Sequence, residues 1–149
     1  MDKEHITTNH IQTQNLGERF AKEIVKNGLQ KTSVVLGLQG NLGGGKTTFL
    51  QGFAKGLGVN EKILSPTFVI QKRFEINNVF KNFYHIDCYR INKPEEILDL
   101  NFKKIILNPK NIIAIEWSEK IIKFLPQNTI FIDFKLIDKD QRKITLKDS

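Results

Sequence analysis

Residues 40–48 read Gly40-Asn41-Leu42-Gly43-Gly44-Gly45-Lys46-Thr47-Thr48, and they follow a strand-like apolar run from Ser33 to Gln39. The stretch matches the pattern G-x-x-x-x-G-K-[ST], in which glycines let successive backbone N–H groups turn towards a polyphosphate. The residues that follow place Phe49, Leu50, Phe53, Ala54 and Leu57 on one helical face before Gly58, a plausible C-cap. Strand, loop and helix therefore occur in the order that a phosphate-binding loop requires.

The loop predicts the contacts of a nucleoside triphosphate. Lys46 would reach the β/γ oxygens, the Thr47 hydroxyl would bind Mg²⁺, and the helix would present its positive end to the phosphates. Asn92-Lys93-Pro94-Glu95 lacks the last Asp of a guanine-reading N-K-x-D, so the expected nucleotide is ATP. We expect cofactor contacts along the loop, from Asn41, Leu42, Gly43, Gly44, Gly45, Lys46, Thr47 and Thr48.

The length indicates one domain covering residues 1–149, and the order of patterns along the chain indicates an α/β fold. Cys88 is the single cysteine, and the first twenty residues hold no apolar run, so we expect a cytoplasmic protein with no membrane partner. The net charge is +7, yet the surplus is spread evenly along the chain, without the basic block that tracks a nucleic-acid backbone. No DNA partner is expected.

The order of patterns predicts a central parallel sheet flanked by antiparallel strands, with helices on both faces. A helix capped at Thr13 should end at Asn27-Gly28, and further helical segments should begin at Pro94 and at Ser118. Ile112 to Ile115 reads as a buried parallel strand. Two antiparallel pairs are expected, over 68–76 with 79–87 and over 129–137 with 142–147.

Two carboxylates could complete the site, because a phosphate loop needs an acid at the end of a neighbouring strand. Glu116 follows the buried strand and is the first candidate for the magnesium side. Asp87 ends another strand and could fill a second metal-shell or water-positioning role. Either acid could instead cap a turn or pair with Arg90.

Three further residues are candidates for a switch or partner contact. Thr67, in Ser65-Pro66-Thr67, could sense the γ-phosphate, or could form an ordinary Ser/Thr turn. Arg90 could stabilise transition-state charge or form a surface ion pair. Trp117 is core or interface, or packs near the site, whereas His85 reads as structural.

Together, Gly40 to Thr48, Ser65-Pro66-Thr67-Phe68, Tyr84 to Arg90 and Ile115-Glu116-Trp117 resemble the bacterial TsaE (YjeE) family. The resemblance implies an ATPase that works with TsaD and TsaB in threonylcarbamoylation of adenosine 37 in tRNAs reading codons that begin with A. We expect this Mg-dependent ATPase to be slow alone, because no obvious charge donor beyond Arg90 completes the site. The tRNA would be met through that complex.

Carried over by position, the resemblance implies a phosphate role for Lys46 and a magnesium role for Thr47 and Glu116, and it matches Asp87 to the aspartate of the family's D-x-Y-R segment. We expect Lys46, Asp87 and Glu116 to be the catalytic residues. Asn41 stands where the family usually has an aspartate, which puts in doubt any catalytic role of that position. Two other functions stay open: a small P-loop phosphotransferase, and an RNA-binding module with a structural nucleotide.

Overall fold

The computed structural model describes residues 3–40, 45–61 and 71–147. Seven strands form one sheet in the order β1-β7-β6-β2-β5-β4-β3. The four central strands are parallel, and β7 and β3 are antiparallel to their neighbours, as predicted. Strand β1 is antiparallel to β7. The strands are β1 (Lys3–Thr7), β2 (Val34–Gly40), β3 (Gln71–Glu75), β4 (Asn82–Asp87), β5 (Asn111–Glu116), β6 (Ile130–Leu136) and β7 (Arg142–Lys147).

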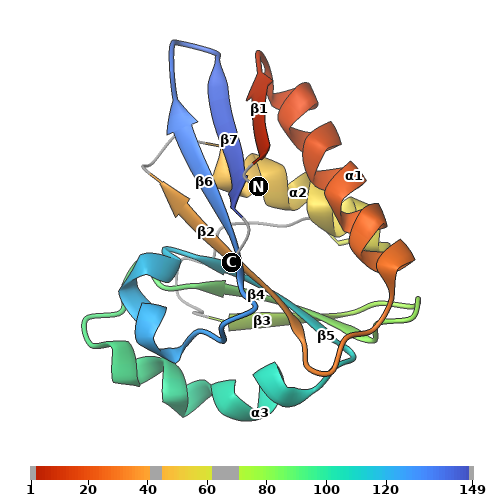
Figure 1. Cartoon of the computed structure of the whole chain (residues 1–149), viewed down its shortest axis with the longest axis vertical. Helices are drawn as coiled ribbons and strands as arrows, with labels where there is room; N and C mark the ends of the chain where they lie inside the picture. The colour runs from red at the N-terminus through yellow and green to blue at the C-terminus, as the bar shows by residue number, and fades with distance from the viewer. Residues whose placement is uncertain (1–2, 41–44, 62–70, 148–149) are drawn as a thin grey trace.

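Helices cover both faces of this sheet (Figure 1). The long helices α1 (His10–Asn27) and α2 (Lys46–Leu57) pack against one face, and shorter helical segments lie against the other. These are α3 (Phe102–Leu107) and the 3₁₀ segments η1 (Pro94–Leu100) and η2 (Ser118–Phe124). The predicted helical segments at Pro94 and Ser118 are therefore 3₁₀ turns.

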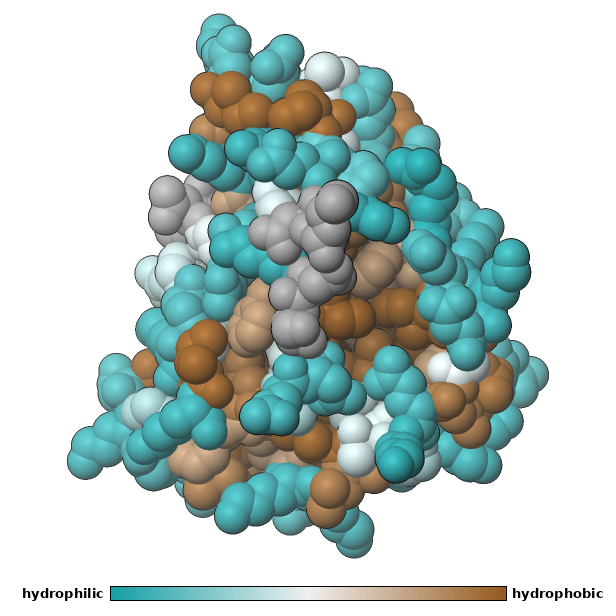
Figure 2. All heavy atoms as spheres, viewed as in Figure 1, coloured by the Kyte–Doolittle hydropathy of each residue, from teal (hydrophilic) through white to brown (hydrophobic). Residues whose placement is uncertain are grey.

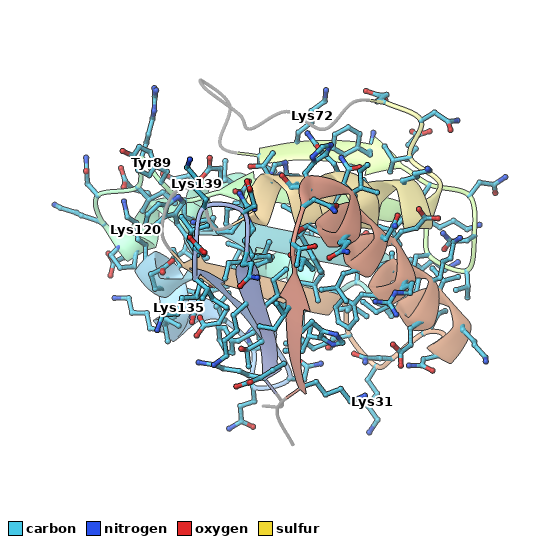
Figure 3. The ribbon with its side chains drawn as sticks, turned by 90° about the horizontal axis from the view of Figure 1, so that it is seen from above. Lys31, Lys72, Tyr89, Lys120, Lys135 and Lys139 are labelled. Atoms are coloured by element: carbon cyan, nitrogen blue, oxygen red, sulfur yellow. The ribbon has the colours of Figure 1, made fainter. Side chains whose placement is uncertain are left out.

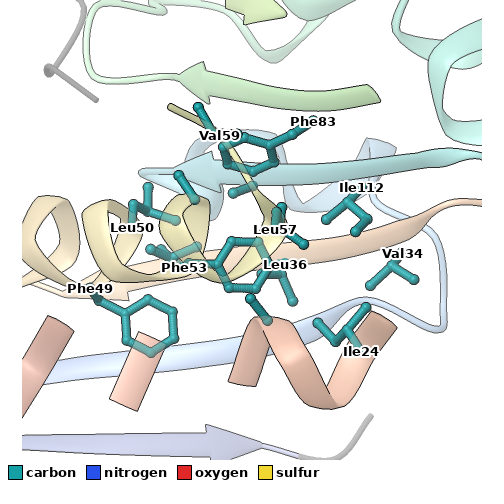
Figure 4. Close-up of a cluster of buried hydrophobic side chains, with 14 of the residues drawn as sticks. Ile24, Val34, Leu36, Phe49, Leu50, Phe53, Leu57, Val59, Phe83 and Ile112 are labelled. Carbon is teal, nitrogen blue, oxygen red and sulfur yellow. The ribbon is translucent and has the colours of Figure 1, made fainter. Parts of the chain in front are cut away.

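The core on the α1/α2 face is aromatic. Phe53 of α2 lies with its ring centre 5.7 Å from that of Phe83 in β4, and Phe49 and Leu36 are fully buried beside them (Figure 4). The apolar face predicted for the loop helix is thus the face that meets the sheet.

Close contact between α1 and α2 depends on glycine. A Cβ atom at Gly52 would lie 1.8 Å from the carbonyl oxygen of Gln14, so only a residue without a side chain fits there. Because the helices touch backbone to backbone, α1 holds α2 firmly, and α2 carries Lys46 and Thr47 on its first turn.

Three elements differ from the sequence predictions. Helix α1 is capped by Asn9, whose side chain accepts the N–H of Gln12 at 2.9 Å, and not by Thr13. Thr13 is buried in the helix, with its hydroxyl 2.7 Å from that of Thr7. Strand β1 and helix α3 were not predicted.

Candidate functional site

The candidate site lies at the carboxyl end of the parallel strands. Register pairs Leu38 of β2 with Glu116 of β5, and Glu116 with Asp87 of β4. Partners in register share a face of the sheet, and this face is the one covered by α2. Both predicted carboxylates therefore lie beside the start of α2, where ligands of open α/β sheets bind.

Lys46 occupies the centre of this arrangement. Its Nζ donates a 2.7 Å hydrogen bond to the carbonyl oxygen of Gly40, and lies 3.9 Å from the ring centre of Trp117. Gly45, at φ +99°, supplies the left-handed turn that starts α2 directly before Lys46.

Burial lowers the pKa of Lys46, while the carboxylates of Glu116, Glu119 and Asp87 oppose this change. The ammonium group of Lys46 thus lies near three carboxylates. This is the arrangement expected of a lysine that binds phosphate next to a metal ion.

Glu116 is held by a residue that the sequence analysis took as structural. The Nε2 atom of His85 lies 2.6 Å from Oε2 of Glu116, and both side chains are almost fully buried. An ionised carboxylate only accepts hydrogen bonds, so Nε2 carries the hydrogen in that state. His85 therefore contacts the carboxylate that the sequence predicts as a metal ligand, and belongs with the candidate site.

Asp87 is partly exposed at the end of β4. Its Oδ1 accepts the backbone N–H of Tyr89 at 3.0 Å. Burial raises the pKa of Asp87. The hydrogen bond from Tyr89 partly offsets this increase, and the nearby charge of Glu116 adds to it. Its carboxylate therefore has a higher affinity for a proton than an ordinary aspartate.

Trp117 closes one wall of the site. It adopts a left-handed backbone at φ +59°, and its ring centre lies 5.3 Å from that of Tyr89. Lys120 donates a hydrogen bond to the carbonyl of Tyr89 and lies 5.4 Å from its ring centre; Figure 3 shows both side chains on one side of the molecule. Because the Trp117 ring also contacts Nζ of Lys46, this wall of the site lies directly beside the phosphate-binding lysine predicted from the sequence.

Some of the remaining candidate residues lie within the described part of the chain, and others lie outside it. Thr47 and Thr48 lie in the first turn of α2, and Arg90 is exposed in the turn after β4. The structure also brings Arg142 to the loop, since a Cβ at Gly45 would lie 2.9 Å from its Cδ. The predictions for Asn41, Leu42, Gly43, Gly44 and Thr67 lie outside the described residues.

The donor set suits magnesium bound together with phosphates. Within residues 3–40, 45–61 and 71–147, no group of three or more His, Cys, Asp or Glu side chains could hold a metal ion. Mg²⁺ is usually bound by one or two carboxylates, several waters and the phosphates of the substrate. Thr47 and Glu116 fit that pattern.

Cys88, between Asp87 and Tyr89, is buried and takes no part in this chemistry. Burial raises the pKa of its thiol to about 12, so it is a neutral core side chain at physiological pH. Among the described helices, none is long and apolar enough to cross a membrane.

Comparison with known proteins identifies the family of the chain. Residues 7–144 match the family model described as "Threonylcarbamoyl adenosine biosynthesis protein TsaE". The chain belongs to the TsaE family. The TsaE protein of Rickettsia typhi is 36% identical over 96% of this chain and 93% of its own length.

Two further relatives extend the comparison. The TsaE protein of Bacillus subtilis is 40% identical over 77% of this chain and 70% of its own. The crystal structure of YdiB from Bacillus subtilis superposes with a TM-score of 0.73 at 31% identity, covering 99% of this chain and 86% of that one. The predicted α/β fold and the predicted family are confirmed.

Proposed function

We propose that this chain binds ATP with Mg²⁺ and hydrolyses it in tRNA threonylcarbamoyladenosine biosynthesis, acting on a complex of TsaB and TsaD. The observation that carries the proposal is the meeting of Lys46, Asp87 and Glu116 at one end of the parallel sheet. Family membership supports the biosynthetic setting, since relatives bear the name of that pathway's protein.

Each residue has a distinct part in the proposed reaction. Lys46 would contribute a cation to the β/γ-phosphate oxygens, and the first turn of α2 would contribute backbone N–H groups. Thr47 and Glu116 would hold Mg²⁺, which when bound neutralises phosphate charge. Asp87, whose raised pKa favours proton uptake, would position the attacking water and accept its proton.

The first test measures hydrolysis with and without a TsaB–TsaD complex. We expect slow turnover alone, stimulation by the complex, and a loss of about a hundredfold or more in Lys46→Ala and Glu116→Ala. Lys55→Ala is the matched control, because Lys55 is an exposed lysine of the same helix. Unchanged turnover in the first two variants would refute the mechanism.

A pull-down with and without ATP tests the proposed partners. The chain should join TsaB and TsaD in a nucleotide-dependent manner, and tRNA should associate only through that complex.

Two other outcomes would point to the alternatives. A phosphotransferase would move the γ-label of ATP to an acceptor other than water. An RNA-binding module would bind tRNA without ATP or partners, with an affinity that falls steeply as salt rises.

A further inference from the structure

A cavity of about 310 Å³ lies at the other end of the sheet from the phosphate loop. It sits where the second half of α1 passes over β1, β7, β6 and the start of β2. Val34 lines it, and the six residues from there to Gly40 place it roughly 20 Å from the loop. This volume is at the lower end of the range for small-molecule sites.

The floor of the cavity is apolar. Residues of α1 at helical spacing meet strand residues that face the same side of the sheet, and Figure 2 shows hydrophobic side chains in a hollow beside α1. The floor consists of Leu16, Phe20, Ile24, Val34, Ile130 and Leu146.

The rim of the cavity is basic. Lys3 and His5 alternate along β1 towards this face, and Arg19 of α1 lies opposite them. In the part of the chain that the structure describes, no carboxylate lies within ion-pair distance of Lys3, His5 or Arg19. Glu23 is the one carboxylate among the cavity's described lining residues, and Lys147, also at the rim, is already paired with Asp133 at 3.0 Å.

The positive charges of Lys3 and Arg19 lie at the same rim and repel each other. Burial and the charges of Arg19 and Lys3 lower the pKa of His5. Glu18 faces the adjoining groove but is paired with Lys22 at 2.9 Å. An anion at the rim would relieve this repulsion, and an apolar body would cover the floor.

We propose that this cavity binds a small organic anion that joins a carboxylate to an apolar chain, with the carboxylate between Lys3, His5 and Arg19 and the chain on the apolar floor. The site is separate from the nucleotide site and does not depend on the function proposed above.

Octanoate is the probe. Octanol, which has the apolar chain without the carboxylate, and acetate, which has the carboxylate without the chain, are the comparison compounds. Binding to the full chain is followed by backbone NMR shifts. Octanoate should bind at least tenfold more tightly than either comparison. Hexanoate, shorter by two methylenes, should bind about fifteenfold more weakly, since each buried methylene contributes about fourfold.

His5 supplies a readout of the carboxylate's position. The side-chain resonances of His5, His10 and His85 are followed against pH, and His5→Gln assigns the first. Octanoate should raise the pKa of His5, because a nearby negative charge favours the imidazolium. Octanol brings no charge and should not raise it.

A pair of double variants separates the rim from general surface charge. Lys3→Gln/Arg19→Gln should weaken octanoate binding by about 2- to 25-fold, since each exposed ion pair contributes between about 1.4-fold and about fivefold. The matched control, Lys72→Gln/Arg73→Gln, removes the same charge from β3 at the opposite edge of the sheet and should leave binding unchanged. Equal binding of octanoate and octanol, or equal effects of the two double variants, would overturn the proposal.

Discussion

Single atoms of a few side chains decide what the candidate site can do. The hydrogen bond between Nε2 of His85 and Oε2 of Glu116 joins two buried groups. Burial raises the pKa of the neighbouring Asp87, and the charge of Glu116 raises it further. Changes at these residues should therefore alter activity and stability in ways that can be separated.

Replacement of Asp87 by Asn should lower activity and raise stability. Burial raises the folded-state pKa of Asp87 above its usual value, so ionisation costs stability as pH rises through that window. Asn carries no such cost. At pH 7 Asp87→Asn should melt higher than the parent while hydrolysis falls about a hundredfold.

The pH dependence checks the cause of this effect. The stability gain should shrink as pH falls towards about 4, and it should vanish below about pH 3, where aspartate is protonated in both the folded and the unfolded state. A gain that is the same at pH 4 and pH 7, in thermal melts, would contradict the electrostatic reason.

Replacement of His85 should act through Glu116. Changes to groups that orient a metal ligand typically cost about 10–100-fold in metal affinity. We expect His85→Phe to raise the Mg²⁺ concentration for half-maximal hydrolysis by that factor. His85→Gln keeps an N–H donor and should recover part of the loss. Equal Mg²⁺ requirements in the parent and in His85→Phe would show that His85 only fills space.

Among elements, the contact between α1 and α2 carries the most severe steric constraint. Alanine in place of glycine usually stabilises a helix interior by about 1 kcal/mol. At Gly52 the added carbon would lie 1.8 Å from the carbonyl oxygen of Gln14, so the helices must separate. We expect Gly52→Ala to lower the free energy of unfolding by about 2 kcal/mol in urea titrations.

The control for this change is Gly58→Asn at the C-cap of α2. Gly58 has φ +92° with nothing within 4 Å of an added Cβ, and Asn tolerates that backbone. We expect Gly58→Asn to lower the free energy of unfolding by less than about 1 kcal/mol. If the two variants lose the same stability, helix contact is not the reason.

Elements with strong local signals were predictable from the sequence. The apolar run before the loop, the face from Phe49 to Leu57 and the Gly58 cap needed only neighbouring residues, and all three are confirmed. Asn9 and Thr13 are both good caps, and the buried contact of Thr13 with Thr7 decides between them. That contact depends on β1, whose five residues include one strongly apolar side chain, Ile6.

The candidate site likewise contains residues that local patterns predict and residues whose contacts depend on distant parts of the chain. Lys46, Asp87 and Glu116 could be predicted because each follows a strand or loop with a recognisable pattern. The contact of His85 with Glu116 could not be predicted, because it depends on β4 lying next to β5, and no local pattern reports which strands are neighbours. Arg142 reaches Gly45 for a similar reason, from a strand almost one hundred residues later in the sequence.

At the scale of the whole molecule, nucleotide binding should appear as heat resistance. A ligand at 100 times its Kd that binds only the folded state adds about 2.7 kcal/mol of stability. For a domain of this size we expect MgATP to raise Tm by about 5–10 °C. Lys46→Ala should lose most of this shift, whereas Lys55→Ala should keep it. A full shift in Lys46→Ala would place the nucleotide elsewhere.

The pairing of β1 with β7 has a consequence for how the protein is made. Lys3 lies opposite Leu146, so β1 leaves the ribosome long before the strand with which it pairs. The central strand β2 likewise borders β5 and β6, which are translated much later. At about 5–20 residues per second, the early segments wait several seconds or more for their partners. We expect the nascent chain to gain its native sheet only after β6 and β7 have been translated, and its apolar β2 segment to need protection until then.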